Sequence, residues 1–295
     1  MEWKSNLITG LQWSDRIINR EGKERIAREL AVQVKDGEVI GAGSGSTVYL
    51  TLFAIAERIR TEKLQVRVIP ASMEISMTCV QLGIPQTTLW ERRPDWTFDG
   101  ADEVDPSHNL IKGRGGAMFK EKLLIKRSER SFILVDNSKF VSRLGSKFPV
   151  PVEVFPTGVV YVENQLKTLG ASKVVLRMAK GKDGPILTEN GNFILDACLT
   201  GLETFWRKRL KALPESLRAD FLSDTISKCW LLEYRLLRSF SLHSVIPTGK
   251  PFLLLRKGEN VYFPAIPFIC STIISVVTIN ESSDAKTMIP LGEAI

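Results

Sequence analysis

The first part of the chain combines two patterns of hydrophobic residues, a helical spacing and short continuous apolar runs. Residues 14–35 place apolar side chains three and four positions apart on a charged background, which predicts an amphipathic helix. The run EVIGAG at 38–43 passes directly into glycines and hydroxyl residues, and residues 46–60 again have helical spacing. The pattern therefore predicts a strand, a glycine-rich turn and a helix in succession.

Strands and helices continue to alternate as far as residue 139. The predicted strands are 65–69, 87–90, 96–99 and 131–135, and the predicted helices are 74–82 and 118–126. Strands that alternate with helices of this length form a parallel sheet with helices on both faces. We therefore expect a Rossmann-like, mostly parallel α/β sheet domain over residues 1–145.

The order of the predicted elements changes after residue 139. They are strand 150–154, helix 157–169, strand 173–178 and strand 193–196. This β-α-β-β order is typical of the first half of a small α+β domain. We expect residues 146–198 to begin a second, ferredoxin-like α+β domain.

The composition excludes several classes of protein. Of the 295 residues, 44% are hydrophobic and 25% are charged, which is the balance of a globular chain. The net charge of +7 is modest and fits an anionic small molecule as readily as nucleic acid. Two histidines give little basis for a Ser-His-Asp triad or a histidine-rich metal site.

Two further features bear on localisation. The four cysteines form no C-x-x-C pair, and the N-terminus lacks the pattern of a signal peptide, so we expect a cytoplasmic protein. The apolar run at 261–279 approaches the length of a membrane span. Pro264 and Pro267 interrupt this run and argue against a span.

The sequence GAGSGST at 41–47 joins the first predicted strand to its helix. Glycines allow a ligand to approach the backbone closely, and the free N–H groups at a helix start attract an anion. The turn has Ser46 where a dinucleotide fingerprint needs its third glycine, and it lacks the lysine of a Walker A loop. We interpret it as a phosphate-binding turn, with a plain hydroxyl-capped turn as the alternative.

Acidic residues are concentrated in DGADEVD at 99–105, directly after a predicted strand. Ligands of open α/β sheets bind at the carboxyl ends of the strands, which makes Asp99 and Asp102 candidates for chemistry. An acidic surface turn and a loop for a divalent metal are the alternatives. The spacing of an EF-hand calcium loop is absent.

A lysine, a glycine-rich turn and a helix follow one another in KGRGGAMFKE at 112–121. Moving a proton between two carbons needs a carboxylate, and a cation stabilises the enediolate oxygen that develops. Asp99, Lys112 and Glu121 supply these groups without a metal. A position on a surface helix is the alternative for Glu121, and a solvated loop is the alternative for Lys139 in VDNSK.

In this order and spacing, the motifs resemble those of the A-type ribose-5-phosphate isomerases. The resemblance covers about residues 14–198 and depends on GAGSGST, FDGADEVD, LIKGRGGAMFKEK, ILVDNSK, LGSKFPVPVEVFP and TENGNFILD. It implies that ribose 5-phosphate and ribulose 5-phosphate are interconverted through an enediolate, in the pentose phosphate pathway, with no cofactor and no metal. It also implies a homodimer that binds neither nucleic acid nor a membrane.

The resemblance also implies roles for single residues. Glu121 would move the proton between C1 and C2, and Lys112 would stabilise the enediolate oxygen. Asp99 would handle the hydroxyl protons and help to open the furanose ring, and Asp102 would complete the catalytic set. The substrate-binding residues that it implies are Ser44, Gly45, Ser46, Thr47, Asp99, Gly100, Ala101, Asp102, Lys112, Gly113, Arg114, Gly115 and Lys139.

Two other classes of function remain open at this point. An amino-sugar phosphate deaminase or a CoA transferase could use the same fold, but a deaminase would need a catalytic histidine, and the nearby candidate is His108. A sugar-phosphate-sensing regulator would need a DNA-binding helix-turn-helix ahead of the sugar domain. About thirty-five residues that form mostly one helix do not provide that motif.

The C-terminal third of the chain, residues 199–295, is abnormal in its pattern. The resemblance implies a closing helix and strand, but residues 199–221 fit neither. With one choice of synonymous codons, a shifted reading frame over this segment gives DRIGNVLEKEIKSITGVIESGF, which resembles the family ending. We hypothesise that this tail is read out of frame from about Ala197 or Cys198, or is unstructured. A genuine lineage-specific extension is the alternative.

Overall fold

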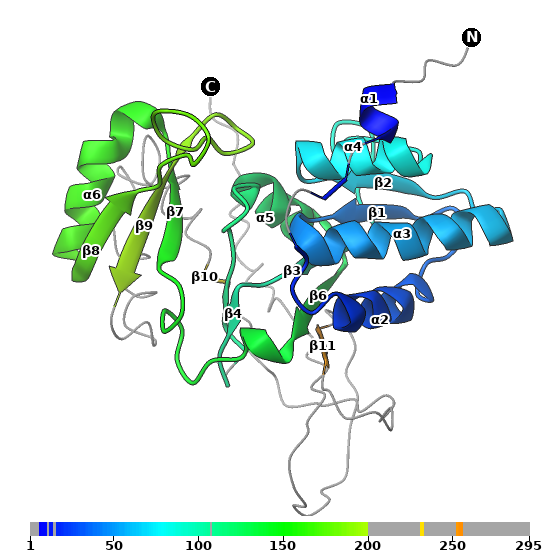
Figure 1. Ribbon diagram of the computed structural model, residues 1–295, viewed down its shortest axis with the longest axis horizontal. Coiled ribbons are helices and arrows are strands. Elements are labelled where there is room, and N and C mark those ends of the chain that lie inside the picture. Colours follow the sequence, from blue (N-terminus) through cyan, green and yellow to red (C-terminus); the bar gives the residue numbers. More distant parts are fainter. Residues whose placement is uncertain are drawn as a thin grey trace, which may run out of the picture.

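The computed structural model describes residues 6–10, 12–13, 16–106, 108–199, 231–232 and 252–255. These residues form three sheets and their covering helices (Figure 1). The largest sheet contains strands β1 (Val39–Ala42), β2 (Arg67–Pro70), β3 (Trp96–Gly100), β6 (Arg130–Asp136) and β11 (Phe252–Leu255). Their order is β11-β6-β3-β1-β2, and all neighbours are parallel except β11, which is antiparallel to β6.

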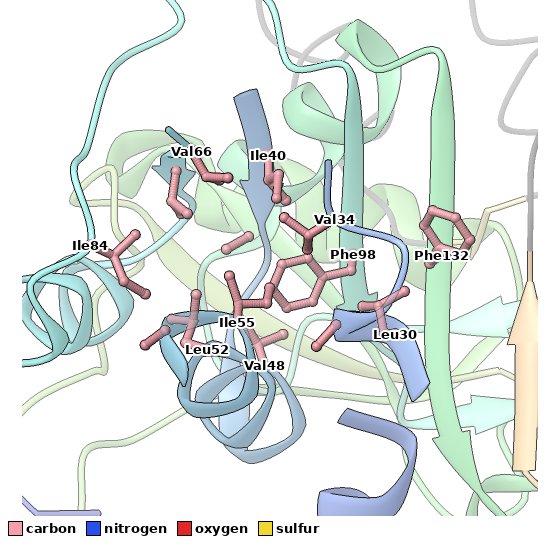
Figure 2. Close-up of a cluster of buried hydrophobic side chains, with 14 of the residues drawn as sticks. Leu30, Val34, Ile40, Val48, Leu52, Ile55, Val66, Ile84, Phe98 and Phe132 are labelled. Atoms are coloured by element: carbon pink, nitrogen blue, oxygen red, sulfur yellow. The ribbon is translucent and has the colours of Figure 1, made fainter. Parts of the chain in front are cut away.

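Helices cover both faces of this sheet. They are α2 (Arg20–Ala31), α3 (Gly45–Glu62), α4 (Met73–Leu82) and α5 (Met118–Arg127), and the short α1 (Asn6–Thr9) lies against α4 (Figure 1). On one face, side chains of α2, α3 and α4 meet the sheet in the main hydrophobic core, where Leu52, Ile55 and Phe98 are fully buried (Figure 2). On the other face, Leu124 of α5 packs against Val39 and Ile69.

The main core explains why the first part of the chain folds as its pattern predicts. The apolar positions of α3 fall three and four apart, so they form one buried stripe against the sheet. The strands carry apolar side chains on both faces because both faces are covered. Burying each large apolar side chain contributes about 1.5–3 kcal/mol.

Two three-stranded sheets are separate from the large sheet. One is antiparallel and contains β4 (Glu103–Val104), β5 (Leu110–Ile111) and β10 (Leu231–Leu232). The other contains β7 (Val150–Val154), β8 (Ala171–Leu176) and β9 (Phe193–Leu199) in the antiparallel order β7-β9-β8. The helix α6 (Val159–Thr168) packs on this second sheet, which lies on the left of α5 in Figure 1, opposite the large sheet. Two 3-10 turns, η1 (Asn137–Lys139) and η2 (Pro156–Gly158), complete the elements.

The structure confirms the mixed α/β class with a parallel sheet, and the β-α-β-β order of the second part is present as β7, α6, β8 and β9. The predicted strand at 87–90 is wrong. The chain makes a single bridge between Gln86 and Val68, and the carbonyl of Thr88 then accepts bonds from two following N–H groups, which forms a turn. Trp90 in this turn is 97% exposed, so its apolar character does not reflect burial in a sheet.

Most of the predicted abnormal tail lies outside the described residues, as does the apolar run at 261–279. The described part of the tail consists of Leu199, which ends β9, and the short strands β10 and β11. In the part of the chain that the structure describes, no helix combines the length and the hydropathy that crossing a membrane requires.

Candidate active site

The glycine-rich turn after β1 lies against the carboxyl end of β3. The N–H of Gly43 donates to the carbonyl of Phe98 at 2.9 Å, which ties the turn to that strand. A Cβ atom at Gly43 would collide with the carboxylate of Asp99, so only glycine permits this approach. Gly45 has φ +85°, a left-handed conformation that suits glycine and starts α3 in the required direction. The N–H of Ser44 also donates to Oδ1 of Asp99 at 3.4 Å, so the turn places its backbone beside this carboxylate.

Three charged side chains from different elements meet beneath this turn. Asp99 lies at the end of β3, Lys112 directly follows β5, and Glu121 lies in the first turns of α5. The Lys112 Nζ is 2.8 Å from Oδ2 of Asp99 and 3.4 Å from Oε2 of Glu121. All three side chains are between 2% and 4% exposed. One ammonium group thus contacts two buried carboxylates.

Burial and mutual charge change the acidity of this cluster. Burial, and next the negative charge of Glu121, raise the pKa of Asp99 to about 7, although the ammonium of Lys112 acts in the opposite direction. Burial alone would lower the pKa of Lys112, but the charges of Asp99 and Glu121 outweigh it and raise that pKa. Lys112 therefore stays protonated at neutral pH, while Asp99 can be either protonated or charged.

Hydrogen bonds fix the orientation of these groups. The Lys112 Nζ donates to the carbonyl of Gly100 at 2.6 Å, and the N–H of Gly100 donates to Oδ1 of Asp99 at 2.7 Å. The hydroxyl of Ser44 donates to Oε1 of Glu121. The sequence analysis assigned Ser44 to the substrate, and the structure additionally connects it to Glu121. The site holds a carboxylate, an ammonium and a second acid whose proton can move, which is suited to transferring a proton between two carbons.

Asp102 lies in the loop after β3, three residues beyond Asp99. Its Oδ2 accepts a hydrogen bond from the N–H of Arg114 at 3.2 Å, and burial raises its pKa. Asp102 thereby links the acidic loop after β3 to the glycine-rich turn that follows Lys112. The positive charge of Lys112 acts on Asp102 in the opposite direction to burial, so Asp102 is also coupled to the cluster electrostatically.

A second group of polar side chains lies at the start of α3. Lys23 of α2 is 8% exposed, and its Nζ donates to Oγ of Ser46 at 2.9 Å. Burial, and next the charge of Lys139, lower the pKa of Lys23. Two lysines from separate elements are therefore near the hydroxyls of the turn and the N-terminus of α3, an arrangement that attracts an anion.

Lys23 is a candidate that the sequence analysis missed. It lies in a helix with many charged residues, and nothing in the local pattern separates it from the exposed ones. Its burial depends on the packing of α2 against α3, which is a tertiary contact.

The structure brings together most of the residues that the sequence analysis predicted as catalytic or substrate-binding. Asp99, Lys112, Glu121 and Ser44 are joined by direct contacts. The other predicted site residues lie at the start of α3, at the end of β3, in the loops after β3 and β5, or in η1. The described residues include no group of three or more histidine, cysteine, aspartate or glutamate side chains placed to hold a metal ion. Gly45, Ser46 and Thr47 are the first residues of α3, Gly100 ends β3, and Lys139 ends η1. The loop residues are Ala101, Asp102, Gly113, Arg114 and Gly115.

Comparison with known proteins gives a consistent result. The sequence model of the family described as Ribose 5-phosphate isomerase A (phosphoriboisomerase A) matches residues 67–219, a range that extends past residue 198 into the predicted tail. Ribose-5-phosphate isomerase A of Methanothermobacter thermautotrophicus is 43% identical over 175 residues, which cover 59% of this chain and 76% of that protein. The same enzyme of Methanocaldococcus jannaschii is 44% identical over 179 residues, or 60% of this chain and 79% of that one.

Solved structures show the same similarity in three dimensions. The ribose 5-phosphate isomerase A of M. jannaschii superposes with a TM-score of 0.63 at 40% identity and covers 67% of this chain and 88% of its own. A D-ribose-5-phosphate isomerase solved in complex with phospho-erythronic acid gives a TM-score of 0.62 at 36% identity, with the same coverage of 67% and 88%.

Proposed function

The chain belongs to the ribose 5-phosphate isomerase A family, and we propose that the cluster of Asp99, Lys112 and Glu121 interconverts ribose 5-phosphate and ribulose 5-phosphate. The observation that carries this proposal is the contact of one buried ammonium with two buried carboxylates, at 2.8 and 3.4 Å. The cluster supplies the base, the acid and the cation that an aldose–ketose isomerisation requires.

The reaction moves one proton between carbons and one between oxygens. Glu121 removes the proton from C2 of the open-chain aldose, and the electrons pass to the C1 carbonyl oxygen to give an enediolate. Lys112 stabilises the negative oxygen. Asp99, whose pKa is about 7, transfers the hydroxyl proton from the oxygen on C2 to the oxygen on C1. Glu121 then returns its proton to C1, which leaves the ketose and restores the enzyme.

The phosphate of the substrate binds at the start of α3 in this proposal. Ser46, Thr47 and the backbone N–H groups of the turn act as donors, and Lys23 and Lys139 supply positive charge. The complex of a solved relative with phospho-erythronic acid, a phosphorylated sugar acid, supports an anionic sugar phosphate as the ligand. The loops at 100–102 and 113–115 would shape the pocket around the sugar.

Family membership also supports finer proposals. We infer a Rossmann-like catalytic domain over residues 1–145 and a ferredoxin-like small domain that begins at 146–198. We also infer a homodimer in the cytoplasm that needs no cofactor or metal and binds neither nucleic acid nor a membrane. The antiparallel sheet of β7, β9 and β8 with α6 on one face supports the small-domain proposal.

The experiment that tests the function follows ribulose 5-phosphate formation from ribose 5-phosphate by the full chain. We expect saturable turnover, and we expect ribose without the phosphate to be turned over at least about a hundredfold less efficiently, because the anion site then has no ligand. Folded protein that forms no ribulose 5-phosphate would overturn the proposal. Release of ammonia from an amino-sugar phosphate would instead favour a deaminase.

A further inference from the structure

The turn between Lys112 and Glu121 is held from outside the large sheet. Gly113 and Gly116 in this turn have φ of +102° and +82°, so the backbone reverses sharply there. The carbonyl of Arg114 accepts a hydrogen bond from Nη1 of Arg177 at 3.0 Å. Arg177 directly follows β8 of the three-stranded sheet, on the far side of α5 from the large sheet (Figure 1). The small sheet therefore reaches the backbone that carries the two proposed catalytic groups.

The carboxylate of Asp196 orients the guanidinium of Arg177 toward this turn. Its Nε donates to Oδ2 of Asp196 on β9 at 2.8 Å, and its Nη2 donates to Oδ1 of the same carboxylate. Both side chains are 18% exposed, so the pair is largely shielded from water. A planar guanidinium bound at two points cannot rotate, which directs the remaining Nη1 to the Arg114 carbonyl.

A second contact from the same sheet holds the end of the turn. The N–H of Glu189 donates to the carbonyl of Gly116 at 3.2 Å. The loop that carries Glu189 is fixed by the fully buried Glu153 of β7, whose Oε1 accepts bonds of 2.8 Å from both Thr188 and Asn192. The small sheet therefore holds the turn at Arg114 and at Gly116, and the Asp102 carboxylate, in the loop after β3, holds the N–H of Arg114.

We propose that Arg177, aligned by Asp196, is a positioning residue that sets the geometry of Lys112 and Glu121 for the isomerisation; this inference rests on the proposed function. The Nη1 group of Arg177 fixes the middle of the turn. The position of the turn then determines where Lys112, just before it, and α5 with Glu121, just after it, are placed. A misplacement of about 1 Å at a reacting group can lower a rate by about a hundredfold. The phosphate site at the start of α3 lies on other elements and does not depend on this contact.

The test replaces Arg177 in the full chain and measures kinetics and backbone protection separately. Arg177→Met keeps the unbranched stem of the side chain and removes the guanidinium that donates to the Arg114 carbonyl. We expect kcat for ribose 5-phosphate to fall about thirtyfold to a hundredfold, with KM changed less than about threefold. Hydrogen–deuterium exchange at the amides of Arg114 and Gly116 should become faster, while exchange in β3 stays unchanged. The matched control is Lys173→Met, an exposed lysine on β8, which should alter neither measurement.

Two further variants separate positioning from general destabilisation. Asp196→Asn should lower kcat in the same direction, and the double variant with Arg177→Met should be no slower than Arg177→Met alone, because both changes remove one contact. Arg177→Lys should recover part of kcat, since its ammonium can donate to the Arg114 carbonyl. A folded Arg177→Met protein with unchanged kcat and unchanged exchange at the turn would overturn the proposal, as would additive effects in the double variant.

The exchange measurement does not need turnover, so it separates this inference from the function itself. If the unaltered chain fails to isomerise ribose 5-phosphate, the proposed function is wrong and so is the kinetic part of the inference. Faster exchange at the turn in Arg177→Met would still show that Arg177 holds it, and unchanged exchange would overturn that part as well.

Discussion

Lys112→Met would leave the two buried carboxylates of the site without the ammonium that lies 2.8 and 3.4 Å from them. Removing one partner of a buried ion pair costs about 3–5 kcal/mol, because the remaining charge is desolvated and uncompensated. Methionine has a similar unbranched shape, so little of this loss would come from a cavity. We expect the free energy of unfolding at pH 9 to fall by about this amount.

The loss of stability in Lys112→Met should be larger at high pH than at low pH. In the folded chain the pKa of Asp99 is raised from 3.8 to about 7, so the folded state binds a proton that the unfolded state releases between these values. Stability therefore falls as pH rises through this window. Without Lys112 the pKa of Asp99 rises further, and the decline becomes larger and extends to higher pH. At pH 5 the protonated Asp99 carries no charge, so the substitution should cost much less there. The raised pKa of Lys112 adds stability that is constant from pH 5 to 9 and is lost only at higher pH.

The assay is urea unfolding at pH 5, 7 and 9, followed by the fluorescence of the chain's tryptophans, among which Trp96 is fully buried in the main core. The exposed Lys173→Met serves as the control for loss of one positive charge. A Lys112→Met protein that is as stable as the unaltered chain at every pH, or that loses more stability at pH 5 than at pH 9, would show that Lys112 does not compensate the two buried carboxylates.

Three other predictions concern binding, metal and the tail. Lys23→Met should raise KM for ribose 5-phosphate about tenfold and change kcat less than about threefold in steady-state assays, because Lys23 contacts Ser46 in the phosphate turn rather than the proton-transfer cluster. Activity should survive exhaustive EDTA treatment, since the proposed roles belong to carboxylates and an ammonium; loss that a divalent ion restores would contradict this. Restoring the reading frame near codon 198 should give a more soluble and more active protein than the chain as written; equal melting temperatures and equal turnover would show that the tail is a real structural element.

The strand, turn and helix at the start of the large sheet could be predicted because the apolar pattern, the turn residues and the helical period all indicate the same structure there. The apolar run is short, the glycines follow it directly, and the helical period of α3 begins at once. The strand predicted at 87–90 failed because a short apolar run contains no information about its partner. In the structure the chain pairs at Gln86 alone and then turns, so Trp90 is left exposed.

The proposed catalytic cluster could be predicted from its motifs, but the residues that support it could not. Asp99 ends a predicted strand, and Lys112 and Glu121 lie on either side of a glycine-rich turn, so their side chains were candidates from the start. Lys23 and Arg177 lie in ordinary charged segments and matter only because distant elements pack beside them. Long-range contacts of this kind have no local pattern, and a structure is needed to find them.

In the proposed reaction, Glu121 moves the proton between the two carbons. Glu121→Gln keeps the shape of the side chain and an oxygen that can accept the Ser44 bond, but it removes the base. The decisive measurement is kcat of this variant together with its Kd for phospho-erythronic acid, determined by calorimetry. We predict that kcat falls by a factor of about 10²–10⁴ while Kd changes less than about threefold. Near-normal kcat in Glu121→Gln would show that another group moves this proton.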